Sequence, residues 1–207
     1  MIEIPFQDLN LLTKTQIKRA SHIISHAFFN DPLMVFLFPI TNERKQKLSL
    51  MMELLIRIGM KYGVVNTTSS NLEGVAIWLP SNKAKITPLM GLVNGGISYF
   101  FKIGSKIVKK QNRFYRLTYS KHNELMPSFH WYLSIIAINP LHQGKGYSKI
   151  LFNSMFEQID NQKLPCFLDT NNKNNVPIYK RFGFKIIEEY KIPDSDLRNW
   201  AMVRASK

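Results

Sequence analysis

The sequence predicts a single α/β domain built on a mixed, mostly antiparallel central sheet of about six to seven strands flanked by helices. The 207 residues suffice for one domain with a sizeable core, whereas two domains would each be unusually small. Hydrophobic residues make up 45% and charged residues 20% of the chain, which is ordinary globular composition. In the second half, β-prone runs alternate with helix-periodic segments, which predicts parallel pairing, and two neighbouring β-prone runs at the end predict antiparallel pairing.

Two helices precede the first predicted strand. Apolar residues recur at helical spacing over residues 13–29, behind a cap at Thr13 or Thr15. Asn30-Asp31-Pro32 ends this helix, because proline disfavours helical geometry at the residue before it. A second helix is predicted over residues 43–62, and Gly63 closes it.

A hairpin and a helical insertion follow. Residues 63–68 and 73–79 are rich in Val, Ile, Thr and Trp, and a turn-forming Ser-Ser-Asn separates them, so they predict a β-hairpin. The pattern is helical again from 87 to 125, as two helices that split near Gln111-Asn112, with Pro127 as the stop. We therefore expect a helical insertion, residues 86–125, before the central strand.

The remaining elements complete the sheet. The run HWYLSIIAI, residues 130–138, predicts a buried central strand that Asn139-Pro140 terminates. Residues 147–159 place apolar side chains on one face of a helix. After it, the patterns predict a strand, a short helix and two further strands, over residues 166–170, 175–182, 184–192 and 200–204.

The charge of the chain favours anionic partners. Its 28 basic and 14 acidic side chains give a net charge of +14, which concentrates anions near the surface. No acidic residue lies between Glu73 and Glu124, and basic residues recur there at helical spacing: Lys102, Lys106, Lys109, Arg113 and Arg116. This basic stripe is compatible with a phosphate of a cofactor, an acidic membrane, RNA or simply a solvated face. Charge alone does not decide among them.

Several classes of protein are excluded. Cys166 is the only cysteine, so neither an intramolecular disulfide nor a thiolate metal cluster can form. His22 and His26 lie one helical turn apart without a third ligand, so we expect no metal. The N-terminus lacks the pattern of a secretory signal, and the least polar stretch, residues 86–101, is too short and too rich in Gly and Pro to span a membrane. We expect a cytoplasmic protein.

One loop has the character of a phosphate site. NPLHQGKGYSKI, residues 139–150, follows a predicted strand and opens a helix, so unpaired N–H groups and the helix dipole would meet at an anion. The spacing of Gly144 and Gly146 does not fit the loop of nucleotide triphosphatases. Lys149 stands where the dinucleotide-binding fingerprint requires a third glycine, so that motif is excluded as well.

Three motifs in order carry a resemblance to a known family. The strand ends apolar-x-apolar-x-Pro, from Ile136 to Pro140, and QGKGYS, residues 143–148, follows the pattern Gln/Arg-x-x-Gly-x-Gly/Ala. Further on come Asn172, then Tyr179 seven positions later, then Gly183-Phe184. With these motifs the chain resembles the GCN5-related N-acetyltransferase (GNAT) family. HAFFNDP, GVAIWLP and the final WAMVR make it most similar to the branch that includes puromycin N-acetyltransferase.

The resemblance covers nearly the whole chain and implies one N-acetyltransferase domain of the GNAT fold, residues 1–207. Residues 1–62 would supply the N-terminal helices, 86–125 the insertion, and 130–192 the core that binds acyl-CoA. Two residues depart from the branch: Ser148 stands where glycine or alanine is usual, and Asp169 stands where glutamate is more frequent.

The family pattern also implies roles for individual residues. The N–H of Ile138 would bind the thioester oxygen, and pantetheine would lie along Ile136, Ala137 and Ile138 like an added strand. Tyr179 would be the general acid, because a phenol stays protonated at neutral pH. The remaining residues implied to bind acetyl-CoA are Gln143, Gly144, Lys145, Gly146, Tyr147, Ser148 and Asn172.

The sequence does not single out one residue as the base or as the contact to the acceptor. Asp31, Glu73, His130 and Asp169 could each serve as the base or contact the acceptor by their positions in loops and strands, and an amine of low pKa could react without a base. Long-range repulsion in a protein of net charge +14 disfavours polycations, whereas the Phe- and Met-rich insertion suits a hydrophobic or aromatic monoamine.

We therefore expect an acetyl-CoA-dependent N-acetyltransferase that acts on a primary amine of a small molecule by direct attack on the thioester. Two alternatives stay open. One is a catalytically silent regulatory module that binds acyl-CoA, and the other is a protein that binds nucleic acid or a membrane surface through the basic stripe. We expect neither nucleic acid nor membrane as the main partner, and the sequence leaves a homodimer open.

Overall fold

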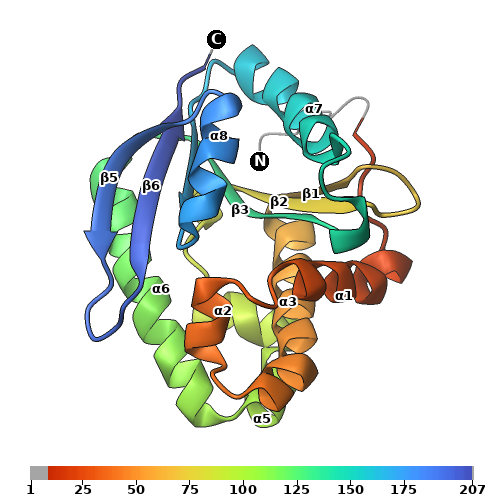
Figure 1. Ribbon diagram of the computed structural model, residues 1–207, viewed down its shortest axis with the longest axis vertical. Helices are drawn as coiled ribbons and strands as arrows, with labels where there is room; N and C mark the ends of the chain where they lie inside the picture. Colours follow the sequence, from red (N-terminus) through yellow and green to blue (C-terminus); the bar gives the residue numbers. More distant parts are fainter. Residues whose placement is uncertain (1–8, 207) are drawn as a thin grey trace.

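A computed structural model describes residues 9–206 and contains one six-stranded sheet (Figure 1). The strand pairs are antiparallel except for β3 and β4, which run parallel. The predicted mixed, mostly antiparallel sheet is thus confirmed. In spatial order, the strands are β1 (Val64–Thr67), β2 (Gly74–Pro80), β3 (Trp131–Ile138), β4 (Cys166–Thr170), β6 (Arg198–Arg204) and β5 (Lys185–Lys191).

Helices cover both faces of the sheet. In Figure 1, α1 and α3 lie below β1, β2 and β3, α7 lies above them, and α6 passes behind β5 and β6. The bounds are α1 (Ile17–Ala27), α2 (Pro32–Leu37), α3 (Thr41–Tyr62), α4 (Pro88–Gly91), α5 (Ile97–Ile103), α6 (Ser105–Leu125), α7 (Tyr147–Asn161) and α8 (Val176–Arg181). Among the described residues, no helix is long and apolar enough to cross a membrane.

The sheet separates two hydrophobic clusters. Ile24 of α1 and Met51 of α3 pack with Ile77 of β2 on one face. Phe152 of α7 packs with Trp78 and Met202 on the other face, where the rings of Trp78 and Phe152 meet edge to face with centroids 6.0 Å apart. Alternate residues of β2 thus serve opposite faces, as strand geometry requires.

The insertion differs from the prediction in one respect. The predicted split near Gln111-Asn112 is wrong, because α6 runs through these residues and the break lies at Gly104, where φ is +93°. Gln111 is buried, and its Oε1 accepts a hydrogen bond of 2.6 Å from the Tyr99 hydroxyl. A polar pair that looked like a turn is therefore held inside the helix by a tertiary contact. Upstream, the chain kinks within residues 92–96, where Asn94 and Gly95 leave helical geometry and Gly95 has a φ of +101°.

Pro32 also has a role that the sequence did not reveal. The first long helix ends before it, as predicted, but Pro32 then opens the short helix α2. The side chain of Asp31 caps that helix by accepting a hydrogen bond of 3.0 Å from the Leu33 N–H.

Strand β3 carries an irregularity that shapes the site. Its register with β2 shifts at Ile77 and Trp78, so that Ser134 is the extra residue of a bulge. Before the bulge, Leu133 packs in the cluster under α7, whereas after it Ile135 packs in the cluster under α1 and α3. The direction of the backbone N–H groups changes along β3 as well. The Trp131 N–H donates to Pro165 O on the β4 side, but the Asn139 N–H donates to Glu73 O on the β2 side.

Two consequences follow for the edge of β3 that faces β4. Successive N–H groups of a strand alternate in direction, so the N–H groups of Ile136 and Ile138 point away from β2. In the described part of the chain, β3 and β4 pair only through Trp131 with Cys166 and Tyr132 with Phe167, and they diverge beyond these residues. The opening between the strands therefore has unpaired backbone donors along one side.

Polar contacts near both ends of helix α7 hold it against the sheet. Near its C-terminus, Asp160 forms a bidentate pair with Arg204 of β6 at 2.8 and 2.6 Å, and the Arg204 side chain is only 6% exposed. Nearer its N-terminus, Asn66 of β1 donates to Leu151 O at 3.3 Å and accepts from Trp78 Nε1 at 2.9 Å. These contacts fix the start of α7 relative to the opening between β3 and β4.

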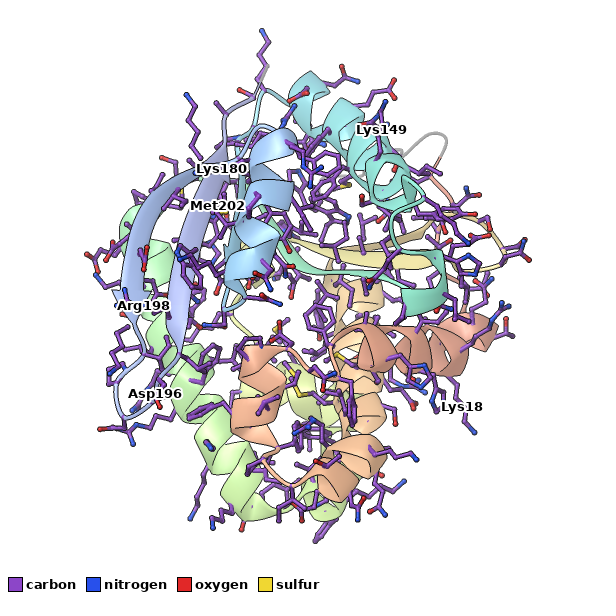
Figure 2. The ribbon with its side chains drawn as sticks, viewed as in Figure 1. Lys18, Lys149, Lys180, Asp196, Arg198 and Met202 are labelled. Carbon is purple, nitrogen blue, oxygen red and sulfur yellow. The ribbon has the colours of Figure 1, made fainter. Side chains whose placement is uncertain are left out.

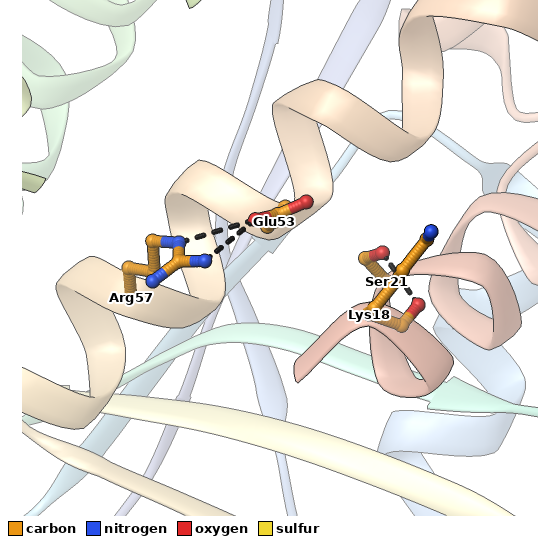
Figure 3. Close-up of polar contacts among 4 residues, drawn as sticks. All are labelled: Lys18, Ser21, Glu53 and Arg57. Carbon is orange, nitrogen blue, oxygen red and sulfur yellow. Dashed lines mark hydrogen bonds and ion pairs between the residues drawn. The ribbon is translucent and has the colours of Figure 1, made fainter. Parts of the chain in front are cut away.

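Some polar contacts join residues one helical turn apart and contribute little to the fold. In α3, Arg57 bonds to Glu53 Oε1 at 3.2 and 2.7 Å, and in α1 the Ser21 hydroxyl donates to Lys18 O at 2.8 Å (Figure 3). Exposed ion pairs of this kind contribute at most about 1 kcal/mol to stability. Figure 2 shows Lys18, Lys149 and Lys180 as three of the basic side chains on α1, α7 and α8.

Candidate active site

The glycine loop has an anion-binding geometry. Gly144 and Gly146 have φ angles of +78° and +84°, which favour glycine, and a Cβ built on either would meet no atom within 4 Å. The space in front of the backbone is thus open, and α7 begins directly after Gly146 with no acidic residue in its first turn. The N–H groups at a helix start lack partners within the helix. These residues fit a pyrophosphate.

The loop is joined to the end of β3. The Gln143 side chain donates to Ile138 O at 3.2 Å, and Lys145 Nζ donates to Leu141 O at 3.2 Å. Asn139 opens the intervening turn by accepting from the Leu141 N–H at 3.1 Å. The glycine loop and the edge of β3 therefore form one continuous row of polar backbone groups.

A small cavity of about 110 Å³ occupies the opening between β3 and β4. Ser134, Ile135 and Ile136 line it from β3, and Leu168, Asp169 and Thr170 line it from β4. Asp31 and Tyr179 complete the wall from the α1–α2 connection and from α8. The bulge and the divergence of the strands thus create this cavity.

Tyr179 is held by packing and leaves its hydroxyl free. Its ring meets Phe152 and Phe184 edge to face, with centroids 6.3 and 6.1 Å away. The hydroxyl makes no hydrogen bond with any described residue. Burial, and secondarily the charges of Asp31 and Asp169, raise the pKa of Tyr179 well above that of free tyrosine. The phenol is therefore protonated at neutral pH.

Asp169 lies where two cavities meet. Its Oδ1 accepts from the Tyr132 hydroxyl at 2.8 Å and its Oδ2 from Asn199 Nδ2 at 2.8 Å. Burial raises the pKa of this carboxyl group, although both hydrogen bonds oppose the shift. Asp169 belongs to the wall that the small cavity shares with a larger one, formed by Leu55, Ala84, Tyr115, Thr118, Tyr132 and Asp169.

The larger cavity measures about 960 Å³ and lies among α3, α5 and α6. Its lining is mainly apolar and aromatic, with Tyr99, Phe100, Phe101, Tyr115, Tyr119 and Tyr132 among the residues. Asp169 is the single carboxylate among the described residues that line it. A site of this composition suits an organic molecule with a large apolar body.

Two buried histidines, His122 and His130, lie side by side at the larger cavity. Their Nε2 atoms are 2.6 Å apart, and His130 Nδ1 lies 2.7 Å from Ser128 O. A carbonyl can only accept, so His130 carries its proton on Nδ1 and its Nε2 accepts from the His122 Nε2–H. Burial lowers both pKa values, that of His122 to about 3, and both rings are neutral at neutral pH. His122 lines the larger cavity, whereas both nitrogens of His130 are occupied.

The structure distributes the four predicted acceptor-side residues over different places. Asp169 lines both cavities and Asp31 the smaller one, where burial raises the Asp31 pKa to about 6. Glu73 lies in the β1–β2 turn, outside both cavities, and accepts from Ser69 and Thr68 at 2.7 Å each, which lowers its pKa. His130 lines neither cavity.

Other predicted residues lie where β3 and β4 end. Asn172 follows β4, outside both cavities, and caps the turn of residues 173–175 by accepting from the Asn174 N–H at 3.1 Å.

Within the described chain, no group of three or more His, Cys, Asp or Glu side chains could hold a metal ion. Cys166 is buried, and burial raises its pKa, so its thiol is not activated.

Sequence reasoning missed several residues of the larger cavity. His122, Tyr115, Tyr119 and Tyr132 sit in a helix and a strand without any motif, and only the packing of α6 against β3 brings them together. Asn199, which holds Asp169, comes from a strand 30 positions later in the chain. No local pattern could have found these pairings.

Comparison with known proteins relates the sequence to acetyltransferases. The model of the acetyltransferase (GNAT) family matches residues 107–184, from α6 to the residue before β5. A curated uncharacterised N-acetyltransferase of Schizosaccharomyces pombe is 27% identical over 185 residues, covering 81% of this chain and 70% of the relative. This relative and the family model agree on the class of reaction.

Solved structures agree on the fold. A crystal structure of histone acetyltransferase HPA2 and related acetyltransferase from Corynebacterium glutamicum superposes with a TM-score of 0.66 at 20% identity, covering 96% of each chain. Arylalkylamine N-acetyltransferase 2 from Aedes aegypti superposes with a TM-score of 0.59 at 13% identity, covering 96% of this chain and 98% of that one. At such identities the likeness concerns the fold alone.

Proposed function

The chain carries an acetyltransferase domain of the GNAT family, and from this premise we propose that it transfers an acetyl group from acetyl-CoA to a primary amine of a small molecule. One observation carries the proposal. The opening between β3 and β4 lies between a glycine loop suited to pyrophosphate, an unbonded tyrosine hydroxyl and a half-buried carboxylate that also lines the larger cavity. These are the parts that acyl transfer to an amine requires.

The residues that would hold acetyl-CoA extend from the glycine loop to the edge of β3. The backbone of residues 143–148 would bind the pyrophosphate, and the edge of Ile136, Ala137 and Ile138 would bind pantetheine as an added strand. Asn172, at the exit of β4, would contribute from the other side of the opening. When bound there, acetyl-CoA supplies an acetyl group activated as a thioester, which an amine can attack directly.

Two groups of this chain would serve the donor side of the reaction. The Ile138 N–H, which faces the opening, would stabilise negative charge that develops on the carbonyl oxygen. Tyr179 would hold a proton on its hydroxyl oxygen and give it to the departing sulfur, whose free thiol pKa is about 8.5 and thus below that of the phenol in water. The transfer leaves a phenolate, which would regain a proton from solvent after the thiol departs, while Asp169 would release to solvent the proton that it takes from the amine.

Asp169 would serve the acceptor side. It is the carboxylate that the larger cavity offers, and Tyr132 and Asn199 hold it in place. Its raised pKa makes it a better proton acceptor than an exposed aspartate, so it would orient the amine and assist the loss of its proton. Asp31 is a second carboxylate near the opening, while His130 would act only by fixing the tautomer of His122.

Thiol release from acetyl-CoA across a panel of amines tests this proposal. We expect arylalkylamines and hydrophobic alkylamines to stimulate release, with mass spectrometry detecting the acetylated amine in equal amount. Polyamines should stimulate it least, because the cavity offers one carboxylate in a protein of net charge +14. If CoA binds but no amine is acetylated, the catalytic proposal is wrong and a silent acyl-CoA-binding module is the better account.

A further inference from the structure

We propose that the acceptor carries an anionic group at the end remote from its amine, and that Lys85 and Arg116 bind this group at the rim of the larger cavity. This inference rests on the proposed function, because it assigns the amine to Asp169. It goes beyond that function by naming the chemical class of the acceptor as an amphoteric molecule with an apolar or aromatic body.

The charges of the larger cavity are separated along its length. Asp169 lies half-buried at the inner wall that it shares with the smaller cavity. Lys85 and Arg116 are exposed and are the cationic residues among the described lining. His122 lies between Asp169 and the two cations, and its ring is neutral because burial lowers its pKa to about 3. One end of the cavity thus favours a cation and the other an anion.

A continuous row of contacts connects the two ends. Lys85 Nζ lies 5.6 Å from the centroid of the Tyr119 ring, and Tyr119 lies 5.9 Å from His122. His122 lies 4.9 Å from Tyr132, whose hydroxyl donates to Asp169 at 2.8 Å. An acceptor whose amine meets Asp169 could lie along this row of rings and bring its far end to Lys85.

Arg116 lies at the same end of the row. It precedes Tyr119 by three positions on α6, and residues at this spacing are neighbours on one helix face. Arg116 forms no hydrogen bond or ion pair with any described residue, whereas Arg113, one turn earlier, pairs with Asp194. Neither Lys85 nor Arg116 forms an ion pair with a described carboxylate, and Asp169 is the only carboxylate in the described lining.

The chemistry of the two cations defines the ligand. A guanidinium group binds carboxylates and phosphates through paired hydrogen bonds, and an ammonium group beside it adds charge without geometric demand. A polyamine would place its second cation against this pair, so it should be rejected. A neutral arylalkylamine would fill the cavity but leave the rim unused.

Matched acceptor pairs test the inference. One pair is para-aminomethylphenylacetic acid with its primary amide, and the other is pyridoxamine phosphate with pyridoxamine. Steady-state kinetics compare the wild type with Arg116→Gln and Lys85→Gln. For the anionic member, we expect each substitution to raise KM about twofold to fivefold with little change in kcat, the range for one solvent-accessible charge pair. KM for the neutral member should not change, and Arg116→Lys should restore part of the loss.

Controls separate this effect from net charge. Lys109→Gln on α6 and Lys83→Gln each remove one exposed cation outside the cavity lining, so they should leave the KM values of both members unchanged. A response of the carboxylate pair, the phosphate pair or both supports the inference and identifies the anion. Acetylation of the anionic members with KM values that do not depend on Lys85 and Arg116 contradicts it, while failure of every amine to react contradicts the proposed function itself.

Discussion

Tyr179→Phe is expected to lower kcat by about a hundredfold to ten-thousandfold, the usual contribution of a positioned general acid. The substitution removes only the hydroxyl, and the ring can keep its contacts with Phe152 and Phe184. The Kd for CoA should therefore change little, because no hydrogen bond of the fold is lost. Steady-state kinetics with the best amine of the panel, together with calorimetry of CoA binding, measures both quantities.

Tyr190→Phe is a suitable control for this substitution. Tyr190 lies on β5, and burial raises its pKa as it does that of Tyr179, but it lines neither cavity. Its loss should leave kcat unchanged. If Tyr179→Phe behaves like this control, Tyr179 is a packing residue and the assigned general acid is wrong.

Gly146→Glu is expected to weaken CoA binding at least about a hundredfold. A side chain at a φ of +84° costs about 1 to 2 kcal/mol of local strain, and the new carboxylate would occupy the open space in which the pyrophosphate is proposed to lie. Repulsion between two anions adds to the strain in that partly enclosed position. Calorimetric titration with CoA measures the loss.

Gly95→Glu provides a matched control for strain and charge. Gly95 has a φ of +101° and a ψ of 14°, close to the angles of Gly146, and leaves room for a Cβ with no atom within 4 Å. It lies in the insertion, away from the loop, so CoA affinity should stay at the wild-type value. Equal weakening by both substitutions would mean that the loop does not bind the pyrophosphate, and Gly146→Ala would separate the cost of strain from that of charge.

The sequence predicts the local elements well because each has a local cause. The strand over 166–170 has the predicted bounds, and the hairpin forms where turn residues separate two β-prone runs. The glycine loop could be placed for the same reason, since a strand, a turn and a helix are all written in consecutive residues. Its left-handed glycines agree with the spacing that suggested it.

The features that sequence analysis missed depend on tertiary contacts. The bulge at Ser134 leaves the apolar alternation of the strand intact, so periodicity cannot locate it. The polar pair Gln111-Asn112 suggested a break, but α6 continues through it, and the buried Gln111 bonds to the Tyr99 hydroxyl. The tautomers of His122 and His130 follow from Ser128 O, two residues before His130, and from the contact between the two rings, which only the folded chain brings together.

The same limit applies to the acceptor side of the site. Position in the sequence could not rank Asp31, Glu73, His130 and Asp169, because each lies at an end of a strand or in a loop. The folded chain distinguishes them by their partners, since Glu73 is engaged with Ser69 and Thr68, and Asp169 is held between Tyr132 and Asn199. Asp169 alone of these four reaches both cavities.

A crystal structure of the protein with a non-hydrolysable acetyl-CoA analogue tests the central claim most directly. The account predicts that the pyrophosphate lies on the N–H groups of residues 143–148, that the carbonyl oxygen of the analogue accepts a hydrogen bond from the Ile138 N–H, and that its acyl end lies beside the Tyr179 hydroxyl. An analogue bound along the basic stripe of α6 or wholly within the larger cavity, with the opening between β3 and β4 left empty, would contradict it.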